Sequence, residues 1–250
     1  MNEGRVVIVT GGTSGIGHSV VRELAATGHR IVACGRRPAT ERHWPGEWTG
    51  QILDYVGDVT HQSATERLFE EALEHWREPA TAFVLCTARG LPGTVLTSDP
   101  VKWPAMFELN IAAVARQLRG CAKIFLEQAR TEPHQRVRDI VVLGSTVGRA
   151  VSASNSVYGA TKFATHALAE SLRQELCEFG VRVSLIEPGF VASEFQATAG
   201  YDPEWVAAKE REVGGFLAPG DVARAVGFVI GQPGHVHIDD IRIRATRQKA

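Results

Sequence analysis

A tyrosine and a lysine four residues apart are the first candidates for chemistry, in the segment Tyr158-Gly159-Ala160-Thr161-Lys162. The segment opens a predicted helix, and side chains at positions i and i+4 share one helix face, so the phenol and the ammonium point the same way. A free tyrosine has a pKa of about 10, and a nearby cation lowers that value by favouring the phenolate. The pair is a candidate general acid and base, although surface pairs of a ring and a cation have the same spacing.

A glycine-rich segment, Thr10-Gly11-Gly12-Thr13-Ser14-Gly15-Ile16-Gly17, separates a predicted strand from a predicted helix. Glycines permit a tight turn and close approach of a pyrophosphate, and the helix N-terminus offers free N–H groups and a positive dipole. The alternative is a turn without a ligand, but dinucleotide binding requires this strand–turn–helix position. The expected cofactor contacts in the turn are Gly11, Thr13, Ser14, Gly15, Ile16 and Gly17.

Two arginines follow the second predicted strand, in Gly35-Arg36-Arg37. The tip of this strand meets the adenosine ribose in dinucleotide-binding folds, and an acidic side chain there would hydrogen-bond a free 2′-hydroxyl. A guanidinium instead binds a 2′-phosphate in bidentate fashion. The sequence therefore predicts NADP(H), with contacts from Arg36 and Arg37. Two solvated arginines at the start of a loop are the alternative.

Short apolar runs alternate with longer helical patterns along the chain. The predicted strands are 5–10, 30–34, 51–56, 81–87, 137–145 and 181–187, with a last strand in the tail 235–246. The predicted helices span about 15–28, 61–77, 100–130 and 156–179. Runs that are apolar throughout are typical of strands buried on both faces, and strand–helix alternation predicts a parallel sheet between helices. We expect one α/β domain over residues 1–250, built on a doubly wound Rossmann-type sheet.

Two segments interrupt this alternation. Residues 35–50 form a loop whose Trp44 and Trp48 are interpreted as loop packing. Residues 190–219 contain several glycines and a proline, and they are predicted to form a mobile flap over the substrate. The aromatic residues of this flap are Phe190, Phe195, Tyr201, Trp205 and Phe216. They favour an apolar substrate, such as an aromatic or polyketide-type ketone.

The bulk properties exclude several classes of function. The net charge is −1, which argues against a large nucleic-acid surface, and no apolar run is long enough to span a bilayer. No cysteine pair has metal-ligand or redox spacing, and His235 and His237 lack a third ligand, so no metal is expected. Reduced thiols and an N-terminus without a leader predict a cytoplasmic protein.

Other residues extend the tyrosine–lysine pair into a longer pattern. Ser145 ends the fifth predicted strand, and Asn110 lies in the long helix after the fourth. Together with the glycine turn and Pro188-Gly189, these residues occur in the order found in the short-chain dehydrogenase/reductase family. The chain resembles the form of that family with roughly 250 residues, over about residues 5–245.

The resemblance implies a role for each matching residue. Tyr158 would exchange the proton, Ser145 would hydrogen-bond the substrate oxygen, and Asn110 would order a water. Lys162 would hold the nicotinamide ribose and lower the Tyr158 pKa. Further implied cofactor contacts, beside Tyr158 and Lys162, are Asp58, Val59, Ala88, Arg89, Pro188, Gly189, Val191 and Ser193.

The chain departs from the family at the end of the fourth strand. The family has Asn-Asn-Ala-Gly there, and this sequence has Cys86-Thr87-Ala88-Arg89. Ala88 is retained, but the paired asparagines are missing and Arg89 replaces a glycine beside the cofactor. Arg89 is interpreted either as a contact to a cofactor phosphate or a substrate anion, or as a residue that faces solvent. The tail 238–246 resembles a subgroup of NADP-dependent alcohol dehydrogenases and ketoreductases.

The resemblance and the residues together predict an NADPH-dependent ketoreductase, or an alcohol dehydrogenase in the reverse direction, that acts on a small carbonyl or alcohol compound. The alternative is a non-catalytic NADP-binding regulator of the same fold. Helices 100–130 and 156–179 resemble those that pair between family subunits, which predicts a homotetramer or homodimer. The alanines expected to permit close helix approach are Ala112, Ala113, Ala115, Ala164, Ala167 and Ala169.

Overall fold

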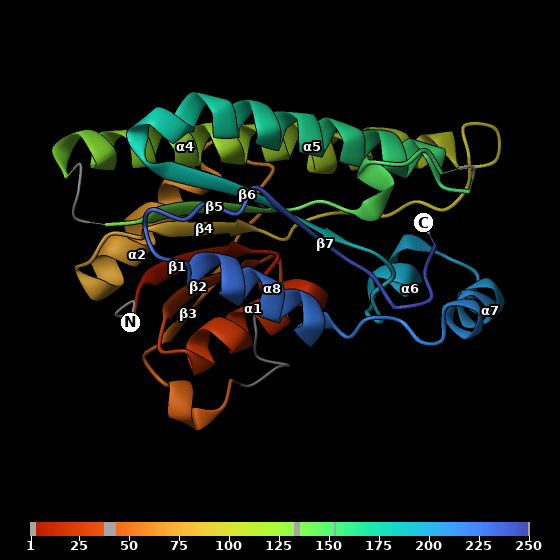
Figure 1. Cartoon of the computed structure of the whole chain (residues 1–250), viewed down its shortest axis with the longest axis horizontal. Coiled ribbons are helices and arrows are strands. Elements are labelled where there is room, and N and C mark those ends of the chain that lie inside the picture. The colour runs from red at the N-terminus through yellow and green to blue at the C-terminus, as the bar shows by residue number, and fades with distance from the viewer. Residues whose placement is uncertain (1–3, 38–43, 133–135, 153, 250) are drawn as a thin grey trace.

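A computed structural model describes residues 4–37, 44–132, 136–152 and 154–249. In these residues seven parallel strands form one sheet between two layers of helices (Figure 1). The strands are β1 (Val6–Thr10), β2 (Arg30–Gly35), β3 (Ile52–Val56), β4 (Ala82–Leu85), β5 (Arg138–Leu143), β6 (Val181–Pro188) and β7 (Asp240–Ile243). The predicted strands and the predicted α/β class are confirmed.

The strand order is β3-β2-β1-β4-β5-β6-β7, so the chain reverses its direction of winding between β1 and β4. In register, Val7 of β1 pairs with Ile31 of β2 and with Ala82 of β4. The loops that leave β1 and β4 run to opposite halves of the sheet, and they leave a crevice at the carboxyl ends of these strands. The predicted glycine turn follows β1 at this crevice.

Alternate side chains of the central strands enter two separate cores. Val6 and Ile8 pack with the helices on one face, whereas Val7 and Val9 pack with those on the other. All four are fully buried. Because successive side chains in a strand point to opposite faces, only a strand that is apolar throughout can fill both cores. This explains why the strands contain continuous apolar runs.

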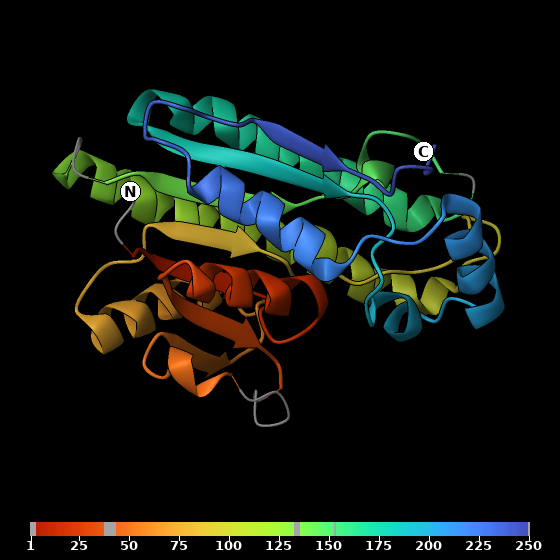
Figure 2. The same ribbon diagram turned by 60° about the horizontal axis from the view of Figure 1, so that its bottom comes forward.

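The helices divide between the two faces of the sheet (Figures 1 and 2). The main helices are α1 (Gly15–Ala26), α2 (Ala64–Trp76), α3 (Trp103–Phe107), α4 (Val114–Thr131), α5 (Ser156–Leu176), α6 (Phe195–Ala199), α7 (Pro203–Val213) and α8 (Pro219–Ile230). Buried residues of α2, α4 and α5 share one core, and those of α1 and α8 share the other. Helices α6 and α7 lie at the carboxyl ends of the strands, on the right in both views.

Three features differ from the sequence prediction. The sequence patterns did not predict α8, which packs against α1. The segment expected to be a flap contains two short helices, α6 and α7. The helix expected over residues 100–130 is interrupted by a π-helical turn at Glu108–Ala113. Such turns are rare within helices, and they are frequent at functional sites.

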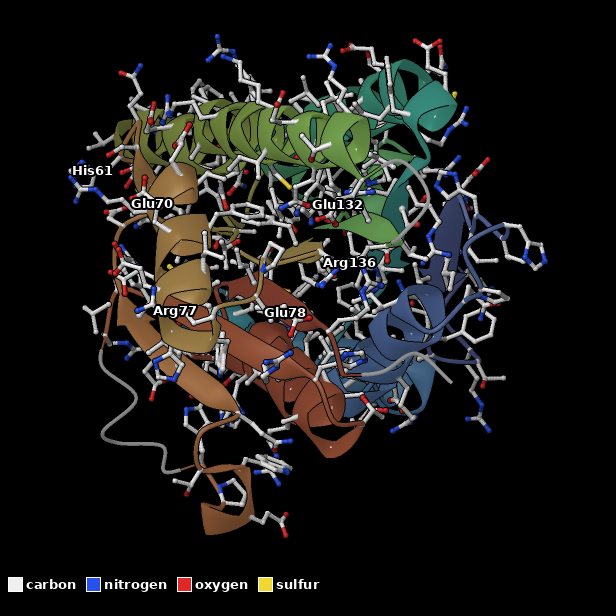
Figure 3. All side chains as sticks on the ribbon, turned by 90° about the vertical axis from the view of Figure 1, so that its left-hand side faces the viewer. His61, Glu70, Arg77, Glu78, Glu132 and Arg136 are labelled. Carbon is white, nitrogen blue, oxygen red and sulfur yellow. The ribbon has the colours of Figure 1, made fainter. Side chains whose placement is uncertain are left out.

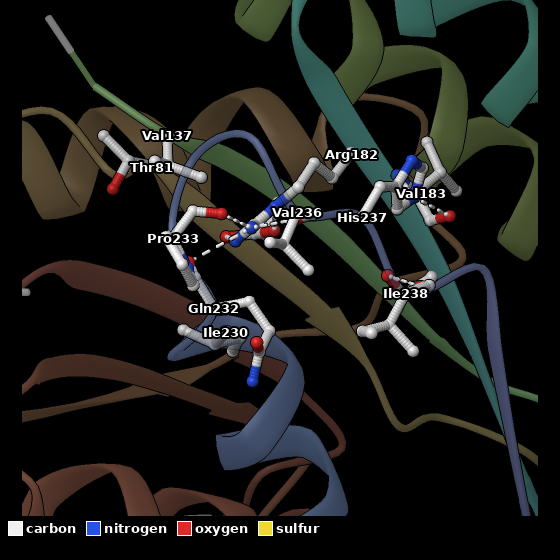
Figure 4. A network of polar contacts seen from close by, with 12 residues as sticks. Thr81, Val137, Arg182, Val183, Ile230, Gln232, Pro233, Val236, His237 and Ile238 are labelled. Atoms are coloured by element: carbon white, nitrogen blue, oxygen red, sulfur yellow. Dashed lines mark hydrogen bonds and ion pairs between the residues drawn. The ribbon is translucent and has the colours of Figure 1, made fainter.

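A buried cluster of charges lies at the amino ends of the strands, which is called here the amino edge of the sheet. Asp139 contacts Arg5 Nη1 through Oδ2 at 2.6 Å and Arg182 Nε through Oδ1 at 2.6 Å. Arg182 Nη1 also donates to the carbonyls of Gln232, Pro233 and Val236 in the loop before β7 (Figure 4). Because Arg5 precedes β1, Asp139 lies in β5 and Arg182 lies in β6, these two ion pairs connect the amino ends of three strands.

The surface around this cluster carries further ion pairs (Figure 3). Glu78 pairs with Arg30 and with Arg136, and Arg136 also approaches Glu132.

In the loop between β2 and β3, the Trp44 ring stacks on His18 at 4.8 Å and its Nε1 donates to Asp54. The expected packing of the loop tryptophan is confirmed by these contacts.

Candidate functional site

Ser145 lies two residues after the last residue of β5, at the carboxyl end of the strand. Its backbone is extended, and its N–H donates to His166 Nε2 at 3.2 Å. Its hydroxyl accepts a weak hydrogen bond from the Val147 N–H at 3.4 Å and lies 3.5 Å from the Pro188 carbonyl. The serine hydroxyl is therefore held between the ends of β5 and β6, where it can face a ligand above the sheet.

Tyr158 lies in the first turn of α5 and is 8% exposed. The ring of Phe195, from α6, covers it with 5.7 Å between ring centroids. Burial raises the pKa of Tyr158 well above its ordinary value, and the nearby phenol of Tyr201 adds to the rise. A hydrogen bond with Ser145 acts in the opposite direction. The phenol is thus protonated at neutral pH and faces the serine hydroxyl.

Lys162 lies one turn after Tyr158 and is 4% exposed. Its Nζ donates to the Leu143 carbonyl at 2.8 Å and lies 6.0 Å from the centroid of the Tyr158 ring. Burial lowers the pKa of Lys162 to about 8. Because burial raises the pKa of Tyr158, this structure shows no net lowering of that pKa. The expected effect of Lys162 on Tyr158 stays a prediction.

Asn110 lies in the π-helical turn, and its amide holds the loop after β4. Oδ1 accepts from the Arg89 N–H and Nδ2 donates to the Arg89 carbonyl, each at 2.8 Å. Nδ2 also donates to Thr161 on α5, between Tyr158 and Lys162. These bonds join the loop after β4, where the asparagines of the family pattern are missing, to α5. The Arg89 guanidinium is exposed and has no hydrogen-bond partner among the described residues.

The glycine turn lies between β1 and α1 as predicted. Gly11 has a φ of +70°, and a Cβ there would lie 3.0 Å from the backbone of the loop after β4. Gly15 has a φ of +51°, and a Cβ there would lie 3.7 Å from Ser193 Cβ. The structure thus brings the turn against the segment that follows β6. Both glycines have the positive φ that other residues rarely adopt, and the turn they form ends at the N-terminus of α1, where free N–H groups can bind an anion.

The predicted adenosine end of the site lies at the tip of β2. A Cβ on Gly35 would lie 2.1 Å from Thr13 Oγ1, so the threonine side chain occupies the space above that glycine. Arg36 and Arg37 are exposed beside it. Hydrogen bonds from Thr60 lower the pKa of Asp58, and the charge of Arg36 lowers it further. One hydroxyl and one guanidinium therefore border the place predicted for a 2′-phosphate.

The segment after β6 begins the flap. The Gly189 N–H donates to the Ile243 carbonyl of β7, and the Phe190 N–H donates to Gln248 Oε1 near the end of the chain. Val191 is buried and forms a bridge with Leu217. The flap is thus attached at both of its ends.

Two residues at the site were not identified as functional from the sequence alone. Phe195 was named only as one of the flap aromatics, and its position over Tyr158 depends on how α6 folds back. His166 lies four residues after Lys162, and this spacing predicts that both share a helix face. The contact of His166 with Ser145, however, depends on the packing of α5 against β5.

The described residues contain no group of three or more His, Cys, Asp or Glu side chains that could hold a metal ion. The same residues include no helix that is long and apolar enough to cross a membrane.

Comparisons with known proteins identify the family. The sequence pattern of the short chain dehydrogenases matches residues 5–204. Dehydrogenase/reductase SDR family member 11 of Bos taurus is 31% identical, over 98% of this chain and 97% of that protein. An uncharacterized oxidoreductase of Staphylococcus saprophyticus is 27% identical, over 96% of this chain and 97% of its own length.

Solved structures give the same result. The closed form of a serine dehydrogenase complexed with NADP+ is 27% identical, with a TM-score of 0.81 over 98% of this chain and 96% of that one. A 3-ketoacyl-(acyl-carrier-protein) reductase from Brucella melitensis complexed with NADH has a TM-score of 0.81 at 21% identity, over 96% and 97% of the two chains, which shows likeness of fold. The resemblance drawn from the glycine turn, Asn110, Ser145, Tyr158 and Lys162 is therefore confirmed, and the chain belongs to the short chain dehydrogenase family, a family of oxidoreductases that act on alcohol and carbonyl groups.

Proposed function

We propose that this protein is an NADPH-dependent ketoreductase, or an alcohol dehydrogenase in the reverse direction, with Tyr158 as the general acid and base. The observation that carries the proposal is the convergence of the Ser145 hydroxyl and the protonated Tyr158 phenol at the carboxyl edge of the sheet. The alternative, a non-catalytic regulator with the same fold, has no need of this pair.

The residues at the crevice fit a dinucleotide cofactor. Gly11 and Gly15, both with positive φ, form the turn that leads to the N-terminus of α1, where free N–H groups attract an anion. The proposed contacts are Gly11, Thr13, Ser14, Gly15, Ile16, Gly17, Arg36, Arg37, Asp58, Val59, Ala88, Arg89, Tyr158, Lys162, Pro188, Gly189, Val191 and Ser193. A bound nicotinamide would supply or accept the hydride.

NADP(H) is the proposed form of the cofactor. Arg36 stands where an acidic residue would select a free 2′-hydroxyl, and the Thr13 hydroxyl lies over the neighbouring Gly35. The serine dehydrogenase structure was complexed with NADP+, and the reductase structure with NADH, so the fold accepts either form. The choice between them therefore depends on Arg36.

Proton transfer is proposed to proceed as follows in the reductive direction. The Ser145 hydroxyl donates a hydrogen bond to the carbonyl oxygen of the substrate and holds it beside Tyr158. The Tyr158 phenol then donates its proton to that oxygen, which becomes the hydroxyl of the product. Because burial raises its pKa, Tyr158 carries this proton at neutral pH, as reduction requires. The Lys162 ammonium places a positive charge beneath the phenolate that is left.

An apolar carbonyl compound, such as an aromatic or polyketide-type ketone, is the proposed substrate. Phe195 lies over Tyr158, where the substituents of the ketone must pass. Farther along the flap, Phe190 stacks on Phe216 at 5.2 Å and Tyr201 stacks on Trp205 at 5.4 Å. These ring contacts form an apolar cluster along the flap.

The proposed assembly is a homotetramer or homodimer that pairs through α4 and α5, in the cytoplasm, as one catalytic domain. Ala113 and Ala169 are buried in the core of this chain, so they cannot contribute to a contact between subunits. Ala112, Ala115, Ala164 and Ala167 remain accessible to a partner. The described cysteines are unpaired, in agreement with a reducing compartment.

The decisive test mixes the purified protein with NADPH and a panel of ketones, and follows the absorbance of the reduced nicotinamide. The panel should pair each aryl ketone with a short aliphatic ketone of the same carbonyl environment. We expect turnover that favours the aryl member, and Ser145→Ala should lose it while still binding NADPH. Binding of NADPH without turnover of any ketone or alcohol would support the regulator instead. Light scattering at micromolar concentration tests the assembly, and a monomer mass would contradict it.

A further inference from the structure

His166 lies directly behind Ser145. It follows Lys162 by one turn of α5, and its Nε2 accepts the Ser145 N–H at 3.2 Å. The glycines on either side leave the space that the ring fills. A Cβ on Gly144 would lie 2.3 Å from Nε2, and one on Gly148 would lie 2.4 Å from Cε1. The imidazole thus packs against the backbone on both sides of the serine.

Burial, supported by three nearby cations, keeps the His166 ring neutral. Lys162 of the same helix, Arg149 after β5 and Arg242 of β7 are close enough to disfavour a second positive charge, whereas Glu187 of β6 favours it. Burial is the largest influence, and together these lower the pKa of His166 to about 4. A neutral imidazole has one nitrogen that donates and one that accepts. Since Nε2 faces an N–H group, it is the accepting nitrogen, and Nδ1 carries the proton.

Besides its hydrogen bond with Tyr158, Ser145 has two other contacts, and both are longer than the bond to His166. Its hydroxyl lies 3.4 Å from the Val147 nitrogen and 3.5 Å from the Pro188 carbonyl, at the limit of a hydrogen bond. Both contacts involve the hydroxyl that must also face the substrate. The bond to His166 is the shortest of the three, and it holds the backbone without occupying the hydroxyl.

We propose that His166 is a positioning residue for the reaction: its Nε2 fixes the Ser145 peptide, so that the serine hydroxyl faces the carbonyl oxygen of the substrate. This inference rests on the proposed function, because it assigns that contact to Ser145. A displacement of about 1 Å at such a group can lower turnover by about 10²-fold. Loss of the accepting nitrogen should therefore lower kcat and leave cofactor binding unchanged.

Two substitutions separate hydrogen bonding from packing. His166→Leu keeps much of the volume and removes the acceptor, whereas His166→Gln returns an acceptor near the position of Nε2. We expect His166→Leu to lower kcat by about tenfold or more, with the Kd for NADPH within about twofold of the unsubstituted protein. His166→Gln should regain most of that loss. If His166 had only a structural role, the kcat values of His166→Leu and His166→Gln would not differ.

His29 provides a matched control at the other edge of the sheet. It is also a buried histidine, and its Nδ1 accepts the Arg5 N–H at 3.0 Å. His29→Leu removes a bond of the same kind, so it should lower thermal stability and leave kcat unchanged. A kcat for His166→Leu that is no lower than that of His29→Leu would overturn the proposal, as would equal activity of His166→Leu and His166→Gln.

Hydrogen exchange at the Ser145 amide provides a readout that does not depend on activity. The amide should exchange faster in His166→Leu than in the unsubstituted protein, and His166→Gln should restore its protection. Equal protection in all three proteins would show that the ring does not hold the peptide. If Ser145→Ala keeps normal turnover, the proposed function fails instead, and the exchange rates then still decide whether His166 fixes the serine backbone.

Discussion

Charged side chains are buried in different ways at the amino ends and at the carboxyl ends of the parallel strands, which are called here the amino edge and the carboxyl edge of the sheet. At the amino edge, the Asp139 carboxylate lies between Arg5 and Arg182, and neighbouring carbonyls accept the remaining guanidinium protons. At the carboxyl edge, the Lys162 ammonium is equally buried, but its contact in the described residues is one carbonyl, that of Leu143. Its pKa is lowered accordingly, to about 8.

This difference indicates a structural role for the charges at the amino ends of the strands and a chemical role for Lys162 at the carboxyl ends. A buried charge with complete compensation keeps its proton state and fastens the strands to one another. A buried charge with incomplete compensation destabilises the fold, but it can respond to a ligand that completes its contacts. The carboxyl edge is also where open α/β sheets bind ligands. The predictions below test whether each edge has the role that its contacts indicate.

The largest expected effect is at the amino edge. Asp139→Asn removes the charge that compensates two buried guanidiniums, and breaking a buried pair in this way costs about 3–5 kcal/mol. Denaturant unfolding should reveal this loss, while kcat of the folded fraction stays normal. Glu170→Gln is the control, because it breaks an exposed pair with Arg173 that is worth about 0–1 kcal/mol. A similar small loss for both variants would mean that the buried cluster is no more important than a surface pair.

The next effect concerns the reacting phenol. Tyr158→Phe keeps the ring packed under Phe195 and removes the hydroxyl that we propose exchanges the proton. We expect turnover to fall by about 10²-fold or more, the scale of general acid catalysis, with the fold and NADPH binding retained. Single-turnover kinetics and fluorescence titration measure the two quantities. Near-normal activity would remove Tyr158 from its proposed role.

Arg89 is expected to contribute an intermediate effect. Its backbone is held by Asn110, whereas its guanidinium is exposed beside the crevice. If it binds a phosphate or a substrate anion, Arg89→Ala removes a charge-assisted hydrogen bond of about 1.5–3 kcal/mol, or a ten- to hundredfold loss of affinity. A role at the cofactor raises the NADPH Kd without substrate, and a role at the substrate raises only the substrate KM. Arg130→Ala, on α4, is the exposed control, and values within twofold for both variants would show that Arg89 is a solvent-facing residue.

Cofactor preference is expected to be a smaller effect. We predict that the unsubstituted protein prefers NADPH to NADH by about tenfold or more in kcat/KM, or at least about 1.4 kcal/mol. Arg36→Asp should erase or invert the preference, because a carboxylate repels the 2′-phosphate and accepts a hydrogen bond from the 2′-hydroxyl. Steady-state kinetics with both cofactors provide the measurement. Equal kcat/KM values in the unsubstituted protein would contradict the assignment of Arg36.

The sequence predicted the fold where each element has its own local pattern. The apolar strands and the glycine turn are local features, so they identified the parallel sheet and its crevice. Helix α8 has an apolar pattern as well, but its segment follows the glycine-rich flap and was not recognised as a helix. The π-helical turn around Asn110 arises from contacts with Arg89 and Thr165, which lie far away in the sequence.

The candidate site also has features that local sequence predicted and features that depend on tertiary packing. The spacing of Tyr158 and Lys162 indicated that they share a helix face, and this is how they lie. The pKa of Tyr158 could not be predicted, because it depends on the cover that Phe195 and the rest of the fold provide. The contact of His166 with Ser145 likewise arises from the packing of α5 against the end of β5. Local spacing identified the groups that we propose to react, and tertiary packing determines their protonation states.

The smallest expected effect tests the comparison most directly. The pKa of Lys162 is about 8 in the folded protein and about 10.5 when the side chain is free, so below pH 8 burial of its charge opposes folding. Between pH 8 and 10.5 the unfolded chain binds more protons than the folded one, so the destabilising effect of burying the charge fades as the pH rises.

The substitution Lys162→Met removes this charge, which stabilises the folded state by about 3 kcal/mol at pH 7. It also leaves the Leu143 carbonyl without its donor, at a cost of about 1–3 kcal/mol. We therefore expect a net stabilisation of about 1 kcal/mol at pH 7, which falls as the pH rises and becomes a net destabilisation of about 1–3 kcal/mol toward pH 10.5, together with loss of turnover. Urea unfolding at several pH values measures it, with Lys123→Met on the exposed side of α4 as the control. If Lys162→Met instead lowers stability at every pH, the ammonium is as well compensated as the arginines at the amino edge, and the contrast between the two edges fails.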